Sequence, residues 1–414
     1  MSKFRLAHLG LLAALIGLNV APVFVDGAAT AYAADTVRPE IGKPLQAAGD
    51  DIKKGKYKEA LAKIHDADAV GNRTPYENYM IEYLRAAAAQ GAGDRETAAK
   101  SYEAVIASGK VTGAAQTTMI KTVATLYYGA GDYPKAITWL NKAISEGGDD
   151  AQTRGLLVQA YFSSGDVARA YKETQAQVNA DEKAGRVPSE EALSMLQSCA
   201  YKLNDKAGEA AALEKLVTFH PTKSAWVKVL NRLSSKSGFN DTRLGLDVFR
   251  LKMAIGAVTS TADLTNMVEL TLQAGYPAEA VKVINFANKT GAFGSGDQAA
   301  RQKRLQTMAE NKAKEDAAAL AQNEAKAKDG NDLVNVGYDY VTNGQADKGI
   351  PLMEQGIAKG DLAHPDEAKL HLGIAYLQAD KKAKGLQALK GVHGTDGTGD
   401  LAHYWTLVAN HPVN

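Results

Sequence analysis

Two stretches of the chain repeat the same order of apolar, small and polar positions. They occupy residues 123–136 and 157–170 and so lie 34 residues apart. The matched positions are Tyr127 and Tyr161, Gly131-Asp132 and Gly165-Asp166, and Ala136 and Ala170. Self-similarity at one period in the range of about 20–50 residues is typical of a fold built from stacked units.

Each copy has the composition of two helices joined by a tight turn. Tyr127 lies on the apolar face of the first helix, and Gly131 permits the positive φ angle that ends it. Asp132 then caps the second helix. Ala136 is placed where that helix crosses the first, because a larger side chain would hold the two backbones apart.

The same signature recurs along most of the chain, with spacings of up to 38 residues. The further copies are Gly55-Lys56-Tyr57, Gly93-Asp94-Arg95, Gly275-Tyr276-Pro277, Val336-Gly337 with Tyr340 and Gly344, and Leu372-Gly373 with Tyr376. Spacings above 34 predict longer turns between some units.

This pattern resembles the tetratricopeptide repeat (TPR) family, in which a small residue, a tyrosine and spaced alanines mark each unit. Ala124, Tyr127, Ala136 and Ala143 occupy those roles here. The resemblance implies an all-α fold, a right-handed α-solenoid of TPR-like helix-turn-helix repeats. It identifies no partner, because TPR arrays serve many unrelated functions.

The pattern divides the chain into four parts. Residues 1–33 form a signal peptide, 34–296 a TPR-like solenoid, 297–330 a long charged helix or connector, and 331–414 C-terminal TPR-like repeats with a capping helix from Leu401. Within the first solenoid block, 189–257 matches poorly, because Ser234–Asp241 is long and polar for a tight turn. The part at 297–330 fits either an extended helix within the stack or a semi-rigid connector between two repeat blocks.

The N-terminal residues have the order of a secretory signal. Lys3 and Arg5 precede an apolar run, and Ala31-Tyr32-Ala33 has the small-x-small form of a cleavage site. We expect cleavage before Ala34 and a periplasmic or secreted protein with no membrane span after cleavage. The alternative is an uncleaved anchor, although the run of about 17 residues is at the short limit for crossing a bilayer.

Charge and cysteine content narrow the function classes. The formal charge is +1 and falls to zero without residues 1–33, which argues against a nucleic-acid partner because such a partner needs a basic surface.

Cys199 is the only cysteine, so stability comes from packing without an internal disulfide. Its helical spacing predicts a buried small residue.

Patterns that would indicate catalysis or cofactor binding are weak. Histidines cluster after residue 360, but no pair has the spacing of a zinc helix, and no cysteine accompanies them. The Gly/Asp-rich segment 391–400 lacks the features of a phosphate or calcium loop and reads as a flexible link to the capping helix. We therefore expect no catalytic residues, no metal site and no cofactor.

The resemblance places partner binding on the first helix of each unit, where side chains not used in helix packing line a groove. The residues expected there are Lys121, Thr125, Tyr128, Gln159, Phe162, Asn335 and Tyr338, with His371 as a further candidate. Such a polar and aromatic groove suits an extended peptide or a helix of a partner. The alternative is that Tyr128 and Phe162 only pack between units.

Three functions fit these sequence features. The first is a non-catalytic scaffold or adaptor in the periplasm or cell envelope that binds a protein or peptide. The second is a helical accessory subunit of an envelope enzyme, such as one acting on the cell wall. The third is a membrane-tethered chaperone-like protein, which requires an uncleaved signal.

Overall fold

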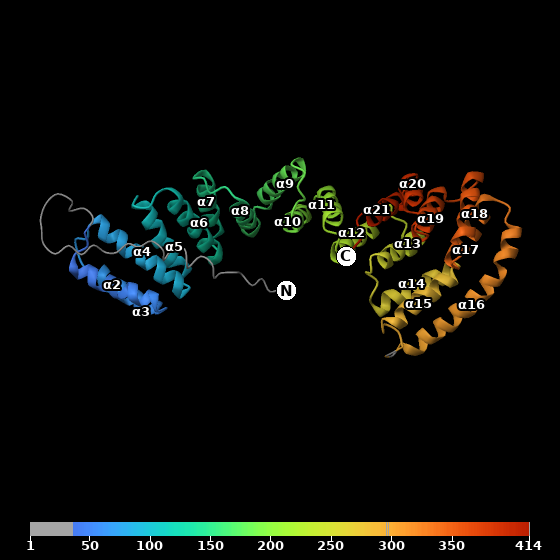
Figure 1. The fold of residues 1–414 in the computed structure, drawn as a ribbon, viewed down its shortest axis with the longest axis horizontal. Coiled ribbons are helices and arrows are strands. Elements are labelled where there is room, and N and C mark those ends of the chain that lie inside the picture. The colour runs from blue at the N-terminus through green and yellow to red at the C-terminus, as the bar shows by residue number, and fades with distance from the viewer. Residues whose placement is uncertain (1–35, 295, 297, 414) are drawn as a thin grey trace. The chain divides into compact units, whose positions relative to one another are not determined.

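The computed structural model describes residues 36–294, 296 and 298–413. Within those residues all regular secondary structure is α-helix, with twenty helices and no strand (Figure 1). The expected cleavage site before Ala34 lies outside the described residues. The helices fall into two compact units, which meet at Glu173 and Thr174. This position lies within the range 34–296 that the sequence pattern treats as one block.

The first unit is a stack of antiparallel helix pairs. Its helices are α2 (Pro39–Lys53), α3 (Tyr57–Asp68), α4 (Pro75–Ala92), α5 (Arg95–Ala107), α6 (Gly113–Ala130), α7 (Tyr133–Ser145) and α8 (Ala151–Ser164), followed by the start of α9 (Val167–Lys183). The pairs are α2 with α3, α4 with α5, and α6 with α7, and each pair also packs on the helix that follows it.

The turn predicted at Gly131-Asp132 is present and has the expected chemistry. Gly131 has a φ of 83°, and the Asp132 carboxylate accepts a hydrogen bond from the Lys135 backbone N–H at 3.2 Å. Gly165, 34 residues on, has a φ of 90° and is followed by the same aspartate cap. The sequence repeat is therefore a repeat of backbone geometry.

The small residues expected at the helix crossings are confirmed. Ala124, Ala136, Ala143 and Ala170 are all fully buried, and Tyr127 is nearly so. Ala124, Ala136 and Ala143 let α6 and α7 approach closely, while the Tyr127 ring fills the space at the end of this pair. The expectation for Cys199 is also confirmed, since it is buried in α10 and burial raises the pKa of its thiol to about 11.

The second unit contains further helix pairs and one long helix. Its helices after α9 are α10 (Glu190–Lys202), α11 (Lys206–Phe219), α12 (Lys223–Ser234), α13 (Asp241–Ala254), α14 (Thr261–Gln273), α15 (Pro277–Lys289), α16 (Ala299–Lys326), α17 (Gly330–Thr342), α18 (Ala346–Lys359), α19 (Pro365–Gln378), α20 (Lys382–Lys390) and α21 (Thr398–Asn410). The long α16 packs on α14, α15 and α17. It buries Leu320 and leaves Met308 exposed.

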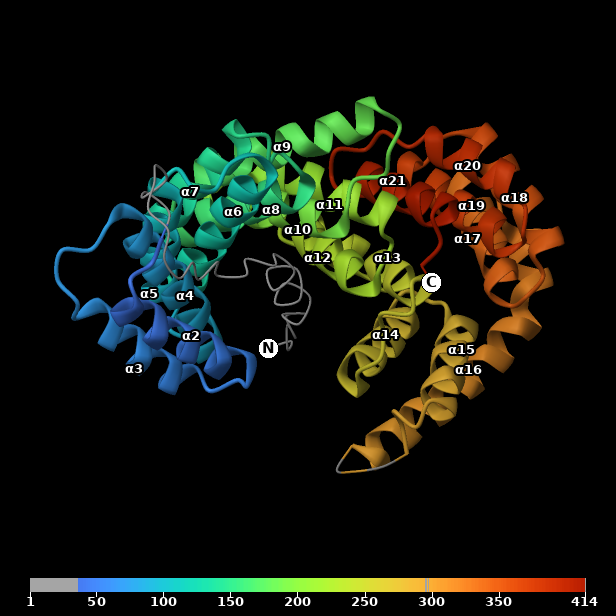
Figure 2. The ribbon, with the colours of Figure 1, turned by 60° about the vertical axis from the view of Figure 1, so that its left-hand side comes forward.

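The end of the chain returns to α12 and α13 within the second unit, as both views show (Figures 1 and 2). Helix α21 packs on α13, α19 and α20. The Asn240 backbone N–H donates to the Asp396 carbonyl at 3.0 Å, and Trp226 meets Tyr404 edge to face with ring centroids 6.0 Å apart. The 391–400 segment, expected to be a flexible link, is thus fixed against the polar loop that follows Ser234.

At two other turns, asparagine or aspartate takes the place of the turn glycine. Asn204 after α10 and Asp380 after α19 both have a φ of 56°. These two residue types tolerate the left-handed region better than other non-glycine residues. The helix-turn-helix unit therefore continues through stretches that lack the Gly-Asp signature.

Helices α17 and α18 approach more closely than alanine would allow. A Cβ on Gly349 would lie 2.2 Å from the Gly337 carbonyl oxygen, and one on Gly356 would lie 2.6 Å from the Gly330 carbonyl oxygen. Both obstacles are backbone atoms and cannot rotate away. Four glycines thus fix the distance between these helices.

We expect Gly349→Ala to destabilise the second unit, because the added methyl group would force α17 and α18 apart. Overpacking of this kind costs on the order of 1–3 kcal/mol. The matched control is Gly245→Ala in α13, where the nearest atom to a new Cβ is 3.7 Å away. Removing that helical glycine is expected to be neutral or to stabilise by about 0.5–1 kcal/mol. Urea unfolding measures both variants, and equal stability of the two would contradict this packing.

Candidate functional site

Five of the expected groove residues lie on α6 and α8, the first helices of consecutive units. Lys121 Nζ is 2.5 Å from an Asp150 carboxylate oxygen, and the Tyr128 hydroxyl is 3.5 Å from Gln159 Oε1. Thr125 is exposed, and its hydroxyl donates to the Lys121 carbonyl at 2.9 Å. The two helices are thus connected through side chains on a shared face.

The aromatic residues of this face are partly used in packing. Tyr128 is half-buried against the core cluster of α4 to α7 and meets Tyr133 edge to face, with ring centroids 5.5 Å apart. Phe162 is also half-buried. Each of the two rings therefore packs inward and still presents some of its surface.

Sequence analysis did not single out two further features of the first unit. Asp150 pairs with Lys121 and also caps α8 by accepting from the Thr153 N–H at 2.8 Å, so its pKa is lowered to about 2 by the lysine and by these backbone and side-chain bonds. Helix α4 adds three tyrosines, Tyr76, Tyr79 and Tyr83, whose neighbouring ring centroids are about 6 Å apart. Tyr76, Tyr79 and Tyr83 are spaced by three and four residues, and this spacing alone places them on one face of a helix.

The expectation for Tyr338 is wrong, because its side chain is only 1% exposed. Its ring is stacked on His371 at 4.9 Å and meets Tyr276 edge to face at 5.1 Å. His371 is likewise buried. Both residues turn toward a buried group of charges, and Tyr338 does not line a groove.

Arg250 of α13 is the centre of that charged group, which we call the Arg250 network. Its guanidinium donates to both Glu279 carboxylate oxygens, at 2.9 and 2.7 Å, and to Asp247 Oδ1 at 2.8 Å. Asp247 Oδ1 is also 2.9 Å from His371 Nε2. The Arg250 guanidinium lies over Tyr276 and Tyr338, 5.1 and 5.0 Å from the ring centroids. The network consists of Arg250, Asp247, Glu279, His371, Tyr276 and Tyr338.

Electrostatics explains why the network is stable despite its burial. Burial alone would raise the pKa of Asp247, but the attraction of His371 and Arg250 outweighs it and lowers that pKa well below its usual range. An ionised carboxylate only accepts hydrogen bonds, so His371 Nε2 carries the proton in their contact. Burial and nearby carboxylates raise the pKa of the Tyr338 hydroxyl, which stays neutral.

A second arginine extends the network toward the end of the chain. Arg243 pairs with Glu367 of α19 and with Asp396 in the loop before α21. All three residues lie at the junction where the C-terminal repeats meet α13. Nearby on α17, burial and the neighbouring Asp316 raise the pKa of Asp339 to about 7.

A cavity of about 350 Å³ opens beside the Arg250 network. It lies between α17 and α19 and contains two of the residues expected in the groove, Asn335 and His371. The lining residues are Tyr276, Asn331, Val334, Asn335, Leu362, Ala363, His364, Glu367, Ala368 and His371. Asn335 and His371 are 36 residues apart, so they occupy equivalent positions on consecutive first helices.

Metal-ligating side chains converge near this cavity, which the sequence did not indicate. Ligand atoms of Asp247, Glu367 and His371 lie within 4.8 Å of one another. However, Arg250 already pairs with Asp247, and Arg243 pairs with Glu367. An ion ligated by all three side chains would have to take the Asp247 and Glu367 oxygens away from their arginines, so the arrangement favours an ion-pair network over metal coordination at that point.

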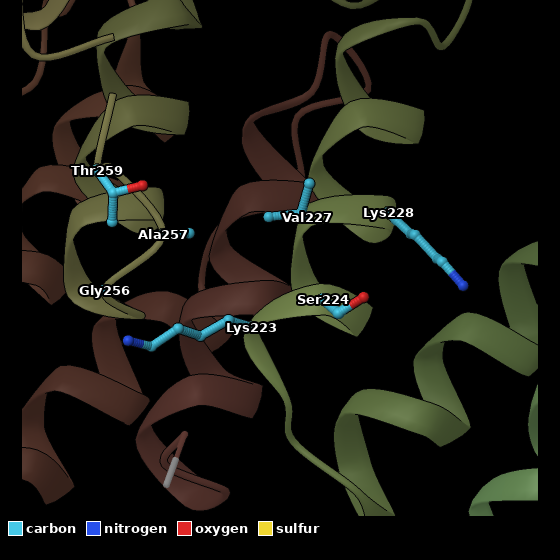
Figure 3. A pocket seen from close by; sticks show the side chains of 7 residues that line it. All are labelled: Lys223, Ser224, Val227, Lys228, Gly256, Ala257 and Thr259. Atoms are coloured by element: carbon cyan, nitrogen blue, oxygen red, sulfur yellow. The ribbon is translucent and has the colours of Figure 1, made fainter. Parts of the chain in front are cut away.

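A second hollow of about 340 Å³ lies between α12 and the loop after α13 (Figure 3). Lys223 reaches toward Gly256, whereas Lys228 points away from the hollow. Polar groups that fix a ligand normally converge on it. These two ammonium groups do not, so the hollow is a weaker candidate than the cavity beside Asn335.

Among the described residues, no helix combines the length and the apolar character needed to cross a membrane.

No family model and no curated protein matches this sequence. Among solved structures, a tetratricopeptide repeat protein from Parabacteroides merdae is 12% identical, with 82% of this chain and 99% of that chain covered and a TM-score of 0.32. The TPR domain of P58(IPK) is 13% identical, with 91% and 100% covered and a TM-score of 0.24. The complex of Naa15/Naa10 bound to HypK-THB is 12% identical, with 84% of this chain and 62% of that chain covered and a TM-score of 0.34.

These likenesses concern the fold alone. The description of this chain as an α-solenoid of TPR-like units rests on its own helix pairs, on the glycine and aspartate turns, and on the alanines buried at the crossings.

Proposed function

We propose that this protein is a non-catalytic scaffold or adaptor of the periplasm or cell envelope that binds another protein. The partner contributes an extended peptide or a helix, which lies against the first helices of the repeats. Two surfaces support this proposal. One is the face of the first unit formed by Lys121, Thr125, Tyr128, Gln159 and Phe162, which we call the α6–α8 face, and the other is the cavity beside Asn335 in the second unit.

The observation that carries the proposal is the composition of the α6–α8 face. It presents the exposed Thr125 and Gln159 beside the half-buried rings of Tyr128 and Phe162. Half-buried rings offer apolar contact area at low entropic cost because packing already limits their rotation, and the polar groups offer hydrogen bonds. A surface of this kind suits a peptide or a partner helix.

The pairing of Lys121 with Asp150 bears on the kind of partner. TPR domains that bind chaperone termini use several basic and asparagine side chains as a carboxylate clamp, as the family resemblance implies. Lys121 is neutralised by Asp150 at 2.5 Å. A partner bound here is therefore recognised by side-chain packing and hydrogen bonds more than by a terminal carboxylate.

The envelope location in this proposal is supported by the signal-like residues 1–33. We expect N-terminal sequencing of the protein isolated from its native host to begin at Ala34. A mature terminus at Met1 or Ser2 would instead support the anchored alternative and contradict cleavage.

The α6–α8 face is tested with a partner captured by cross-linking from the native envelope. We expect Gln159→Ala and Phe162→Ala to weaken its binding, by about 2 kcal/mol or more if Phe162 is a central anchor and by less if it lies at the rim. Lys121→Ala should have a smaller effect, because it removes a partly exposed ion pair.

The matched controls are Asn141→Ala on α7 and Lys100→Ala on α5, both exposed side chains on second helices. They should leave binding unchanged. Melting temperatures separate lost folding from lost binding for Phe162→Ala. If every folded variant of the α6–α8 face binds the partner as the unmodified protein does, the proposed surface is wrong.

A further inference from the structure

The cavity beside Asn335 has a chemical character that identifies what it can bind. Its walls come from two consecutive first helices, α17 and α19, and the loop between α18 and α19 closes one end. Tyr276 adds an aromatic ring from the α14–α15 turn. A volume of about 350 Å³ is at the small end for a binding pocket, suited to one side chain of a partner.

The ion pairs around this cavity do not balance. Four carboxylates belong to the Arg250 network and its extension, those of Asp247, Glu279, Glu367 and Asp396, and they share only two guanidinium groups, Arg250 and Arg243. The cluster thus has twice as many carboxylates as guanidinium groups, and His371, which contacts Asp247, supplies at most one further positive charge. Glu367 is the member of this group that lines the cavity, and its side chain is only 19% exposed, so water screens its charge weakly and a cation beside it is stabilised.

We propose that this cavity receives the ammonium or guanidinium group of a lysine or arginine side chain carried by the protein partner. That the cation belongs to a protein partner rests on the proposed scaffold function, whereas the preference of the cavity for a cation does not. Glu367 supplies the carboxylate, since one of its oxygens, Oε2, is bonded to Arg243 and the other, Oε1, remains for a second cation. Asn335 is exposed at the wall and supplies an amide oxygen.

The aromatic wall favours the same class of ligand. Tyrosine rings attract cations through their π faces, and Arg250 already uses the Tyr276 ring in this way at 5.1 Å. The apolar side chains of Val334 and Leu362 provide contact for the methylene stem of a lysine or arginine. An anionic ligand would meet Glu367 and the excess of carboxylates behind it.

Binding to the full-length protein can be measured by saturation-transfer NMR with four capped tripeptides. The probes are acetyl-Ala-Lys-Ala-amide and acetyl-Ala-Arg-Ala-amide, with norleucine or glutamate at the central position as the neutral and acidic counterparts. We expect the lysine and arginine probes to bind at least about tenfold more tightly than the norleucine probe, as a charge-assisted hydrogen bond allows. The glutamate probe should bind least. Equal binding of the lysine and norleucine probes would overturn the proposal.

Two variants locate the binding. Asn335→Phe fills the cavity from an exposed position on α17, and Glu367→Gln removes the carboxylate charge at nearly constant shape. Each should reduce binding of the lysine probe by about tenfold or more. Glu315→Gln, an exposed acid on α16, is the charge-matched control and should have no effect.

Glu367→Gln also weakens the pair with Arg243, so its melting temperature must be compared with that of the unmodified protein. Asn335→Phe leaves the ion pairs intact and decides the question if Glu367→Gln unfolds. Unchanged lysine binding in Asn335→Phe would place the cation elsewhere and refute the site. Because the probes need no partner, this failure is distinct from the failure of partner capture by the α6–α8 face.

Discussion

A buried guanidinium is stable in a protein only when carboxylates pair with it, and this requirement organises the second unit around Arg250. The side chain is 4% exposed and is held by Asp247 on its own helix and by Glu279 on α15. Tyr338 of α17 and His371 of α19 complete the enclosure. Four helices therefore depend on one charge, and removal of one partner from such a buried set typically costs about 3–5 kcal/mol.

The same network explains how a repeat array acquires long-range order. In a simple solenoid each unit contacts only its neighbours, and stability adds up along the chain. Here His371 meets Asp247 across 124 residues of sequence, and Arg243 pairs with Glu367 across the same separation. The contact between Trp226 and Tyr404 adds an apolar connection at the end of the chain. Within the second unit, the C-terminal helices thus return to α12 and α13.

The sequence predicted local geometry well because local geometry follows from period and turn chemistry. Gly131, Asp132 and Ala136 have the backbone angle, the cap and the burial that their types and spacing imply. The prediction from the sequence failed for Tyr338, because helical periodicity shows which residues share one side of a helix but not what covers that side. Arg243, Asp247 and Arg250 have the spacing of a solvated charged face, and their partners lie up to 153 residues away. A single sequence carries no local signal of such partners.

Arg250 joins the C-terminal repeats to α13, and hydrogen exchange of the Arg250→Met variant tests this directly, with Lys252→Met on the same helix as the control. We predict faster exchange of the amides of α13, α17 and α19 together in Arg250→Met, with the helices of residues 36–173 unchanged and with little effect in the control. Exchange that changes in α13 alone, or as little as in Lys252→Met, would contradict the claim that this buried charge holds the second unit together.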